Sequence, residues 1–152
     1  MENLIQIKLV QQADFHFAAD FGNAGTPALV TDEPPPLGGG QGPNPEQVHG
    51  AAVANCLVAR LLFAMRKFKN DPSPLQALAT VTPVRNAQNR MRIGSIAVDL
   101  RLGVAATTVV SLDRILAQFE DFCVVTQSVR SAIAVTVRVM DLGGALLHSS
   151  DR

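Results

Sequence analysis

Hydrophobic and polar residues alternate along the first part of the chain, which predicts β-strands. In residues 4–10, every second residue from Ile5 to Leu9 is apolar and the residues between them are polar. The alternation recurs over residues 14–21, and an Asn-Ala-Gly-Thr turn leads to a short apolar run over residues 27–32. We therefore expect three short strands joined by turns.

A loop rich in proline and glycine separates these strands from a long predicted helix. The segment EPPPLGGGQGPNP, residues 33–45, can join neither a helix nor a strand ladder. Asn44 and Pro45 form a strong helix start, because Asn accepts hydrogen bonds from free N–H groups and Pro has no N–H to satisfy. Gln47 stands where a capping box has its second residue. The helix should run to about Lys69, where Asn-Asp-Pro-Ser-Pro ends it.

The second half of the chain returns to strands and adds a second helix. Residues 75–84 and 90–102 predict two strands, and residues 132–141 predict a last one. Between them, apolar residues at helical spacing predict a helix over residues 112–123, capped by Ser111. Because strands outnumber helices and hairpin-like turns join them, we expect an α+β fold with antiparallel sheet.

Composition narrows the possible classes of function. The chain has 152 residues, of which 47% are hydrophobic and 17% charged, as in a globular protein. No linker divides it, so we expect a single domain over residues 1–152. The formal net charge is zero and Trp and Tyr are absent, which argues against a nucleic-acid-binding protein.

The most apolar stretch, residues 48–65, is long enough to cross a membrane. It contains His49, Asn55 and Arg60, and it lies between patterns typical of soluble proteins. We therefore interpret it as a buried helix at a core or a subunit interface and expect no membrane association. The N-terminus lacks the pattern of a signal peptide, so we expect a cytoplasmic protein.

The two cysteines, Cys56 and Cys123, are the main candidates for chemistry. Arg60 follows Cys56 by one helical turn, and a nearby cation would favour the nucleophilic thiolate. The alternative is that each cysteine is a small apolar core residue, which is the commoner role of a lone cysteine on an apolar helix. The three histidines are scattered and there is no Cys-x-x-Cys pair, so we expect no metal site.

Glu46 and His49, both in the first predicted helix, are weaker candidates for residues of the site. Glu46 suits the helix N-terminus, where the macrodipole favours a carboxylate, and it lies about 15 Å along the axis from Cys56. The two could share a site only through a broken helix, a bridging group or a partner chain. His49 could act as a base for acyl transfer at Cys56, but its separation of about 10.5 Å along the helix is too large without a second chain.

The segment DEPPPLGGGQGPNPEQVHGAAVANCLVARLL resembles the OsmC/Ohr family of osmotically inducible and organic-hydroperoxide-resistance proteins. The family pattern combines an Asp-Pro-rich turn, Gly-Gly, a Gly-x-Asn/Ser-Pro-Glu helix start and Ala-x-Cys. These features match Asp32 to Pro36, Gly38 to Gly40, Gly42 to Glu46, and Ala54 to Cys56. The family's second cysteine stands in a Cys-Pro-Val-Ser-like turn, which here is FCVVTQS, with Cys123 and a valine in place of proline.

The resemblance implies antiparallel sheets packed on two central helices in an intertwined homodimer. It also implies a thiol peroxidase that needs no cofactor. Cys56 would be the peroxidatic cysteine that attacks an organic hydroperoxide. Cys123 would be the resolving cysteine, and an external dithiol would reduce the resulting disulfide.

One departure from the family concerns an arginine of the N-terminal strands, which in active members pairs with the first cysteine and the helix-start glutamate. No arginine precedes Arg60 here, and His16 occupies the comparable strand. His16, Arg60 and Glu46 are therefore the expected supporting residues. The alternative function is a diverged OsmC-like protein without efficient peroxidase activity, which binds an apolar ligand or acts through its dimer surface.

Overall fold

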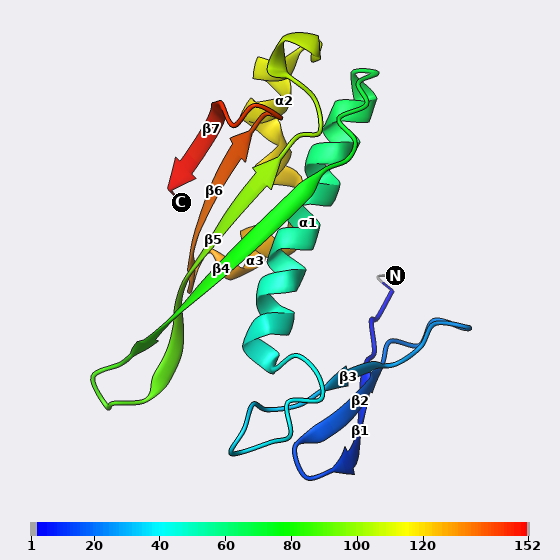
Figure 1. The fold of residues 1–152 in the computed structure, drawn as a ribbon, viewed down its shortest axis with the longest axis vertical. Helices are drawn as coiled ribbons and strands as arrows, with labels where there is room; N and C mark the ends of the chain where they lie inside the picture. Colours follow the sequence, from blue (N-terminus) through cyan, green and yellow to red (C-terminus); the bar gives the residue numbers. More distant parts are fainter. Residues whose placement is uncertain (1–2, 152) are drawn as a thin grey trace. The chain divides into compact units, whose positions relative to one another are not determined.

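The computed structural model describes residues 3–151, which form two compact units, one up to Val48 and one from His49. The first unit contains a three-stranded antiparallel sheet in the order β1-β2-β3 (Figure 1). Its strands are β1 (Lys8–Ala13), β2 (His16–Asp20) and β3 (Leu29–Thr31). The three predicted strands are confirmed, although the first begins at Lys8 rather than at residue 4.

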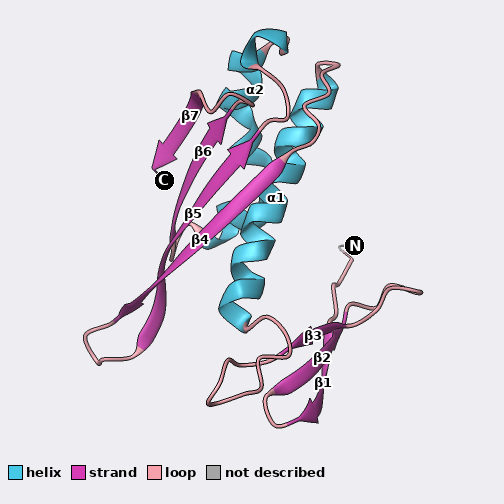
Figure 2. Cartoon of the chain, in the orientation of Figure 1, coloured by secondary structure: helices cyan, strands magenta, loops and turns pink. Residues whose placement is uncertain are grey.

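A long loop follows β3 (Figure 2), and Asp32 organises it. Its carboxylate is buried and accepts N–H groups from Glu33 at 2.8 Å, Gly39 at 3.2 Å and Gln41 at 3.1 Å. The N–H of Gln41 contributes most to lowering the pKa of Asp32 below its ordinary value. A Cβ atom at Gly42 would lie only 2.2 Å from the backbone oxygen of Val30, so this loop requires glycine there.

The long helix α1 (Pro45–Lys67) begins as predicted. The Gln47 N–H donates to Asn44 Oδ1, and the Asn44 N–H donates to Gln47 Oε1, both at 2.9 Å, which completes a capping box. The helix ends slightly earlier than expected because Lys69 has a left-handed φ of 63°. The N–H of Asn70 then donates to the carbonyl of Met65 at 2.9 Å, as in a Schellman motif.

The second unit contains a four-stranded sheet in the order β4-β5-β6-β7. Its strands are β4 (Gln76–Arg85), β5 (Met91–Arg101), β6 (Ala134–Met140) and β7 (Leu146–Asp151). The expected α+β fold with antiparallel strands is confirmed, and one pair departs from it, because β5 and β6 run parallel. The connection through residues 102–133 carries helices, and such a long crossover returns the chain to the end where β5 began.

The predicted helix over residues 112–123 is divided into shorter pieces. They are α2 (Leu112–Gln118), the 3₁₀ helix η2 (Phe119–Phe122) and α3 (Val124–Val129), and another 3₁₀ turn, η1 (Ala106–Thr108), precedes them. Within the predicted range α2 ends at Gln118 and η2 follows, and the extended backbone of Cys123, with φ −81° and ψ 99°, separates η2 from α3. Ser111 does not cap α2: its φ is 60° and its side chain makes no capping hydrogen bond.

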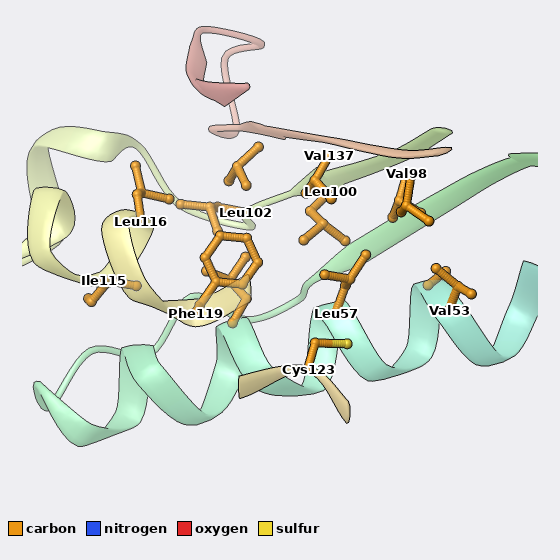
Figure 3. Packing of buried hydrophobic residues seen from close by; sticks show 14 of the residues in the cluster. Val53, Leu57, Val98, Leu100, Leu102, Ile115, Leu116, Phe119, Cys123 and Val137 are labelled. Carbon is orange, nitrogen blue, oxygen red and sulfur yellow. The ribbon is translucent and has the colours of Figure 1, made fainter. Parts of the chain in front are cut away.

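The core of the second unit lies between the sheet and α1 (Figures 1 and 3). Alternate residues Ile96, Val98 and Leu100 of β5 face it and are almost fully buried. Leu57 and Phe119 are equally buried on the helical side, and burial of each such side chain stabilises the fold by about 1.5–3 kcal/mol. The buried residues of α1 recur at helical spacing: Gly50, Val53, Ala54, Leu57, Leu61 and Met65.

The helix α1 also meets the length and hydropathy of a membrane span, with one third of its most apolar window buried. Its buried residues pack into the cluster that includes β5 and β6. This packing is that of a core helix, as we expected.

Candidate functional site

The helix α1 and the start of α3 carry the two cysteines. Cys56 is half-buried and directly precedes the fully buried Leu57 of α1. Cys123 is fully buried and stands at the N-terminal cap of α3, where its side chain joins the core next to α1 (Figure 3). Both cysteines are free thiols.

The chain brings these two cysteines into one core, although they are far apart in the sequence: Cys56 packs against the buried cluster that contains Cys123. Burial raises the pKa of Cys123 above its ordinary value of 9.0, and the neighbouring Cys56 thiol raises it further. Thr126 acts in the opposite direction through its hydroxyl and its backbone N–H. The Cys123 thiol donates to Thr126 Oγ1 at 3.0 Å, and this hydrogen bond is fully buried.

The other predicted site residues do not form a site within the described chain. Arg60 is half-buried one turn beyond Cys56, but within residues 3–151 neither a hydrogen bond nor an ion pair joins it to the sulfur. Glu46 is exposed in the first turn of α1, so the unbroken helix keeps it about 15 Å along the axis from Cys56.

His16 and His49 each have a buried ring nitrogen without a partner among the described residues. His16 lies in β2 and is close enough to Asp32 to lower the pKa of that carboxyl slightly. Its Nε2 atom, like that of His49 in α1, is buried and makes no hydrogen bond within residues 3–151.

A buried ionic cluster next to the Cys123 segment was not predicted. Glu120 Oε1 accepts hydrogen bonds from Arg130 at 2.5 Å and Ser150 at 2.9 Å, and Glu120 Oε2 lies 2.6 Å from His148 Nε2. No spacing in the sequence joins these four residues. The only sequence feature that hinted at this cluster is the spacing of His148 and Ser150. Two polar residues two positions apart lie on the same face of a strand.

The partners of Glu120 keep its carboxyl ionised. Burial acts to raise the pKa of Glu120, but hydrogen bonds from Arg130, His148 and Ser150 together outweigh burial and lower it below its ordinary value. Glu120, His148 and Ser150 also line a pocket of about 320 Å³. Among the described residues, no group of His, Cys, Asp and Glu side chains could hold a metal ion.

Comparisons with known proteins find a family for most of the chain. The family model for OsmC-like protein matches residues 38–138, which include both cysteines. A search of curated protein sequences finds no match.

Solved structures share the fold at low sequence identity. An OsmC-like protein of unknown function from Vibrio cholerae is 13% identical with a TM-score of 0.76, over 91% of this chain and 100% of that one. The organic hydroperoxide resistance protein OsmC from Legionella pneumophila is 17% identical with a TM-score of 0.68, over 90% and 96% of the two chains. The organic hydroperoxide resistance protein OhrB from Bacillus subtilis is 16% identical with a TM-score of 0.66, over 90% and 98%.

The family match covers the loop, α1, both cysteines and most of the second sheet, and the structural matches cover nearly the whole chain. With its α+β fold of two sheets and few helices, the chain belongs to the OsmC-like protein family.

Proposed function

We propose that the protein is a thiol-dependent organic hydroperoxide reductase of oxidative-stress defence, with Cys56 as the peroxidatic and Cys123 as the resolving cysteine. The observation that carries the proposal is that both free thiols belong to one core, where Cys56 packs against the cluster that contains Cys123 and influences its pKa. Two family relatives are named organic hydroperoxide resistance proteins, which supports a hydroperoxide as the substrate.

The reaction would proceed in three steps. The Cys56 thiolate attacks one oxygen of the hydroperoxide, the O–O bond breaks, and the alcohol leaves after taking up a proton, so that Cys56 becomes a sulfenic acid. The Cys123 thiol then attacks the Cys56 sulfur, an S–S bond forms, and water leaves. An external dithiol reduces this disulfide by exchange and is itself oxidised to a disulfide.

The different surroundings of the two cysteines support this division of roles. Cys56 is half-buried, so a substrate can approach it, whereas Cys123 is fully buried with a raised pKa. A protonated, buried thiol is a poor first nucleophile. It can still react with a sulfenic acid formed directly beside it.

We further propose a cytoplasmic homodimer in which each subunit is a single domain. The outer face of α1 carries small residues and the exposed Phe63, and such an apolar face is normally covered. Strand β1 is exposed throughout, with Leu9 and Val10 uncovered. A partner subunit that covers these surfaces could also supply the supporting contacts that we assign to Glu46, Arg60 and His16.

The test is the reaction of the reduced protein with one equivalent of cumene hydroperoxide. We expect the loss of two thiols and the appearance of a Cys56–Cys123 disulfide, followed by turnover when dithiothreitol is present. In Cys123→Ser, Cys56 should still consume one equivalent and become trappable by dimedone. Undiminished peroxide consumption by Cys56→Ser would contradict the proposal.

A second candidate function is a diverged OsmC-like protein that binds an apolar ligand, or acts through its dimer surface, without efficient turnover. It is favoured by the absence of arginine before Arg60 and by the lack of a contact between Arg60 and Cys56 in the described chain. Fast, saturable turnover supported by a dithiol would exclude it. Stoichiometric oxidation of Cys56 with very slow turnover would favour it.

A further inference from the structure

We propose that Glu120 is a positioning residue for Cys123: its side chain ties the segment before Cys123 to β7 and so holds the Cys123 sulfur beside Cys56. The inference rests on the proposed function of the two cysteines. Glu120 itself neither contacts the sulfur atoms nor exchanges electrons with them.

The Glu120 side chain is buried and held in place by three hydrogen-bond partners. It is 9% exposed, and the Arg130 side chain that donates to it is 8% exposed. Its two oxygens together contact Arg130, His148 and Ser150. Hydrogen bonds between charged partners are about twice as strong as neutral ones, so this carboxylate holds its partners firmly.

The main chain of Glu120 connects this anchor to Cys123. The carbonyl of Glu120 accepts the Cys123 N–H at 3.0 Å and the Gln127 side-chain amide at 3.0 Å. The Gln127 N–H in turn donates to the Cys123 carbonyl at 2.9 Å. One residue therefore bonds to the sheet through its side chain and fixes both sides of Cys123 through its backbone.

The far end of the link is β7. His148 pairs with Val139 and Ser150 with Val137 of β6, so both partners of Glu120 are held by the sheet. The ring of His148 also packs edge-on against Phe119, with 5.7 Å between ring centroids. Figure 3 shows Phe119 and Cys123 directed into the core between the sheet and α1.

Arg130 makes the link sensitive to the charge of Glu120. Its Nη2 atom donates to Glu120 and to the carbonyl of Val135 at 3.2 Å, while its buried Nε and Nη1 atoms have no hydrogen-bond partner in the described part of the chain. An amide in place of the Glu120 carboxylate would leave a buried guanidinium without its counter-charge. The Cys123 segment would then loosen from β7.

A loosened segment should affect only the second chemical step. Formation of the disulfide requires the two sulfurs at bonding geometry, and a misplacement of about 1 Å can cost about 100-fold in rate. The attack of Cys56 on a hydroperoxide takes place on α1 and does not use this segment. A purely structural role of Glu120 would weaken folding without separating the two steps.

The experiment measures both steps in single turnovers with cumene hydroperoxide. In Glu120→Gln we expect sulfenic acid formation at Cys56 to be unchanged and disulfide formation to slow at least about tenfold. Ser150→Ala, which removes one hydrogen bond and should fold normally, should slow the disulfide step by a smaller factor. Asp99→Asn is the matched control, because it breaks the more exposed Asp99–Arg138 ion pair of the same sheet and should change neither step.

Equal slowing of both steps, or wild-type disulfide formation in both Glu120→Gln and Ser150→Ala, would overturn the inference. A second measurement does not depend on peroxide. In equilibrium with dithiothreitol, Glu120→Gln should make the Cys56–Cys123 disulfide about tenfold easier to reduce, which corresponds to about 30 mV. If wild-type Cys56 does not react with hydroperoxide, the proposed function fails. The dithiothreitol equilibrium still tests the role of Glu120 in that case. An equilibrium that is the same in wild type and Glu120→Gln would refute the positioning role of Glu120.

Discussion

The Cys123 thiol donates a buried hydrogen bond to the Thr126 hydroxyl oxygen across 3.0 Å. This contact joins the cap of α3 to its first turn. When Cys123 is ionised the Thr126 hydroxyl can turn and donate to the thiolate, and this interaction partly offsets the rise in the pKa of Cys123 that burial causes. The hydroxyl should therefore matter more for reactivity than for stability.

The first prediction removes that hydroxyl. Thr126→Val keeps the side-chain volume but should raise the pKa of Cys123 further, because the interaction that lowers it is lost. We expect the pH at which Cys123 ionises to rise, measured by the pH dependence of the Cβ chemical shift of labelled Cys123 in NMR. Thr126→Ser keeps the hydroxyl and is the control, with an expected titration close to wild type. Equal titration midpoints in all three proteins would show that the hydrogen bond does not influence the thiol.

The second prediction concerns the influence of one cysteine on the other. Because the Cys56 thiol raises the pKa of Cys123, Cys56→Ala should shift the titration of Cys123, followed by the Cβ chemical shift of the labelled residue in NMR, to lower pH. Burial, the larger cause, remains, so the midpoint should stay above the ordinary value of 9.0. An unchanged midpoint would mean that the two thiols do not interact.

The third prediction tests Glu120 at acid pH. Its pKa is lowered in the folded chain, so its stabilisation is present above the ordinary value of 4.5 and is lost as pH falls through the folded pKa. Glu120→Gln should be less stable than wild type by about 3 kcal/mol near neutral pH, because Arg130 remains buried without its counter-charge. The difference should narrow below about pH 4, as measured by urea unfolding. Asp99→Asn should lower the free energy of unfolding by less than about 1 kcal/mol, because the Asp99–Arg138 ion pair is more exposed.

The fourth prediction concerns the start of α1. Asn44→Ala removes the side-chain acceptor of the Gln47 N–H and should lower the free energy of unfolding by about 1 kcal/mol. Asn44→Asp keeps an acceptor at the same position and should retain most of the stability. A loss of the same size in both variants would show that the capping hydrogen bond is not the cause.

The fifth prediction tests the proposed homodimer. Phe63 of α1 is 66% exposed in the single chain, and a charge at this position would oppose burial against a partner. We expect Phe63→Glu to shift the protein from dimer to monomer in analytical ultracentrifugation. Leu142→Glu changes another exposed apolar residue, in the turn before β7, and serves as the control. A wild-type protein that sediments as a monomer would contradict the proposed dimer directly.

Local chemistry made part of this fold predictable from the sequence. The capping box of Asn44 and Gln47 involves neighbouring residues, so its signal is complete within four positions. The apolar spacing of α1 likewise predicted a core helix that begins at Pro45. The end of α1 at Lys67 was not predicted, because the left-handed position that follows it is usually a glycine and here is Lys69.

The remaining features depend on contacts between distant segments. The parallel pairing of β5 and β6 is set by the path of the crossover, which alternation within each strand does not encode. Strand β7 was missed because its pairing with β6 gives it order that its polar sequence does not suggest. Glu120 meets His148 and Ser150 only once β7 is in place, so no motif could have predicted that cluster.

The full burial of Cys123 has a consequence for the reduced protein in a mixture of electrophiles. A reagent that diffuses to the chain meets the half-buried Cys56 first, because Cys123 offers no exposed surface and retains its proton to higher pH. In the reduced protein, Cys123 is thereby protected from alkylation and from irreversible oxidation until Cys56 has been oxidised. The Cys123 thiol is thus inaccessible to reagents in the solvent but remains available to the Cys56 sulfur of the same chain.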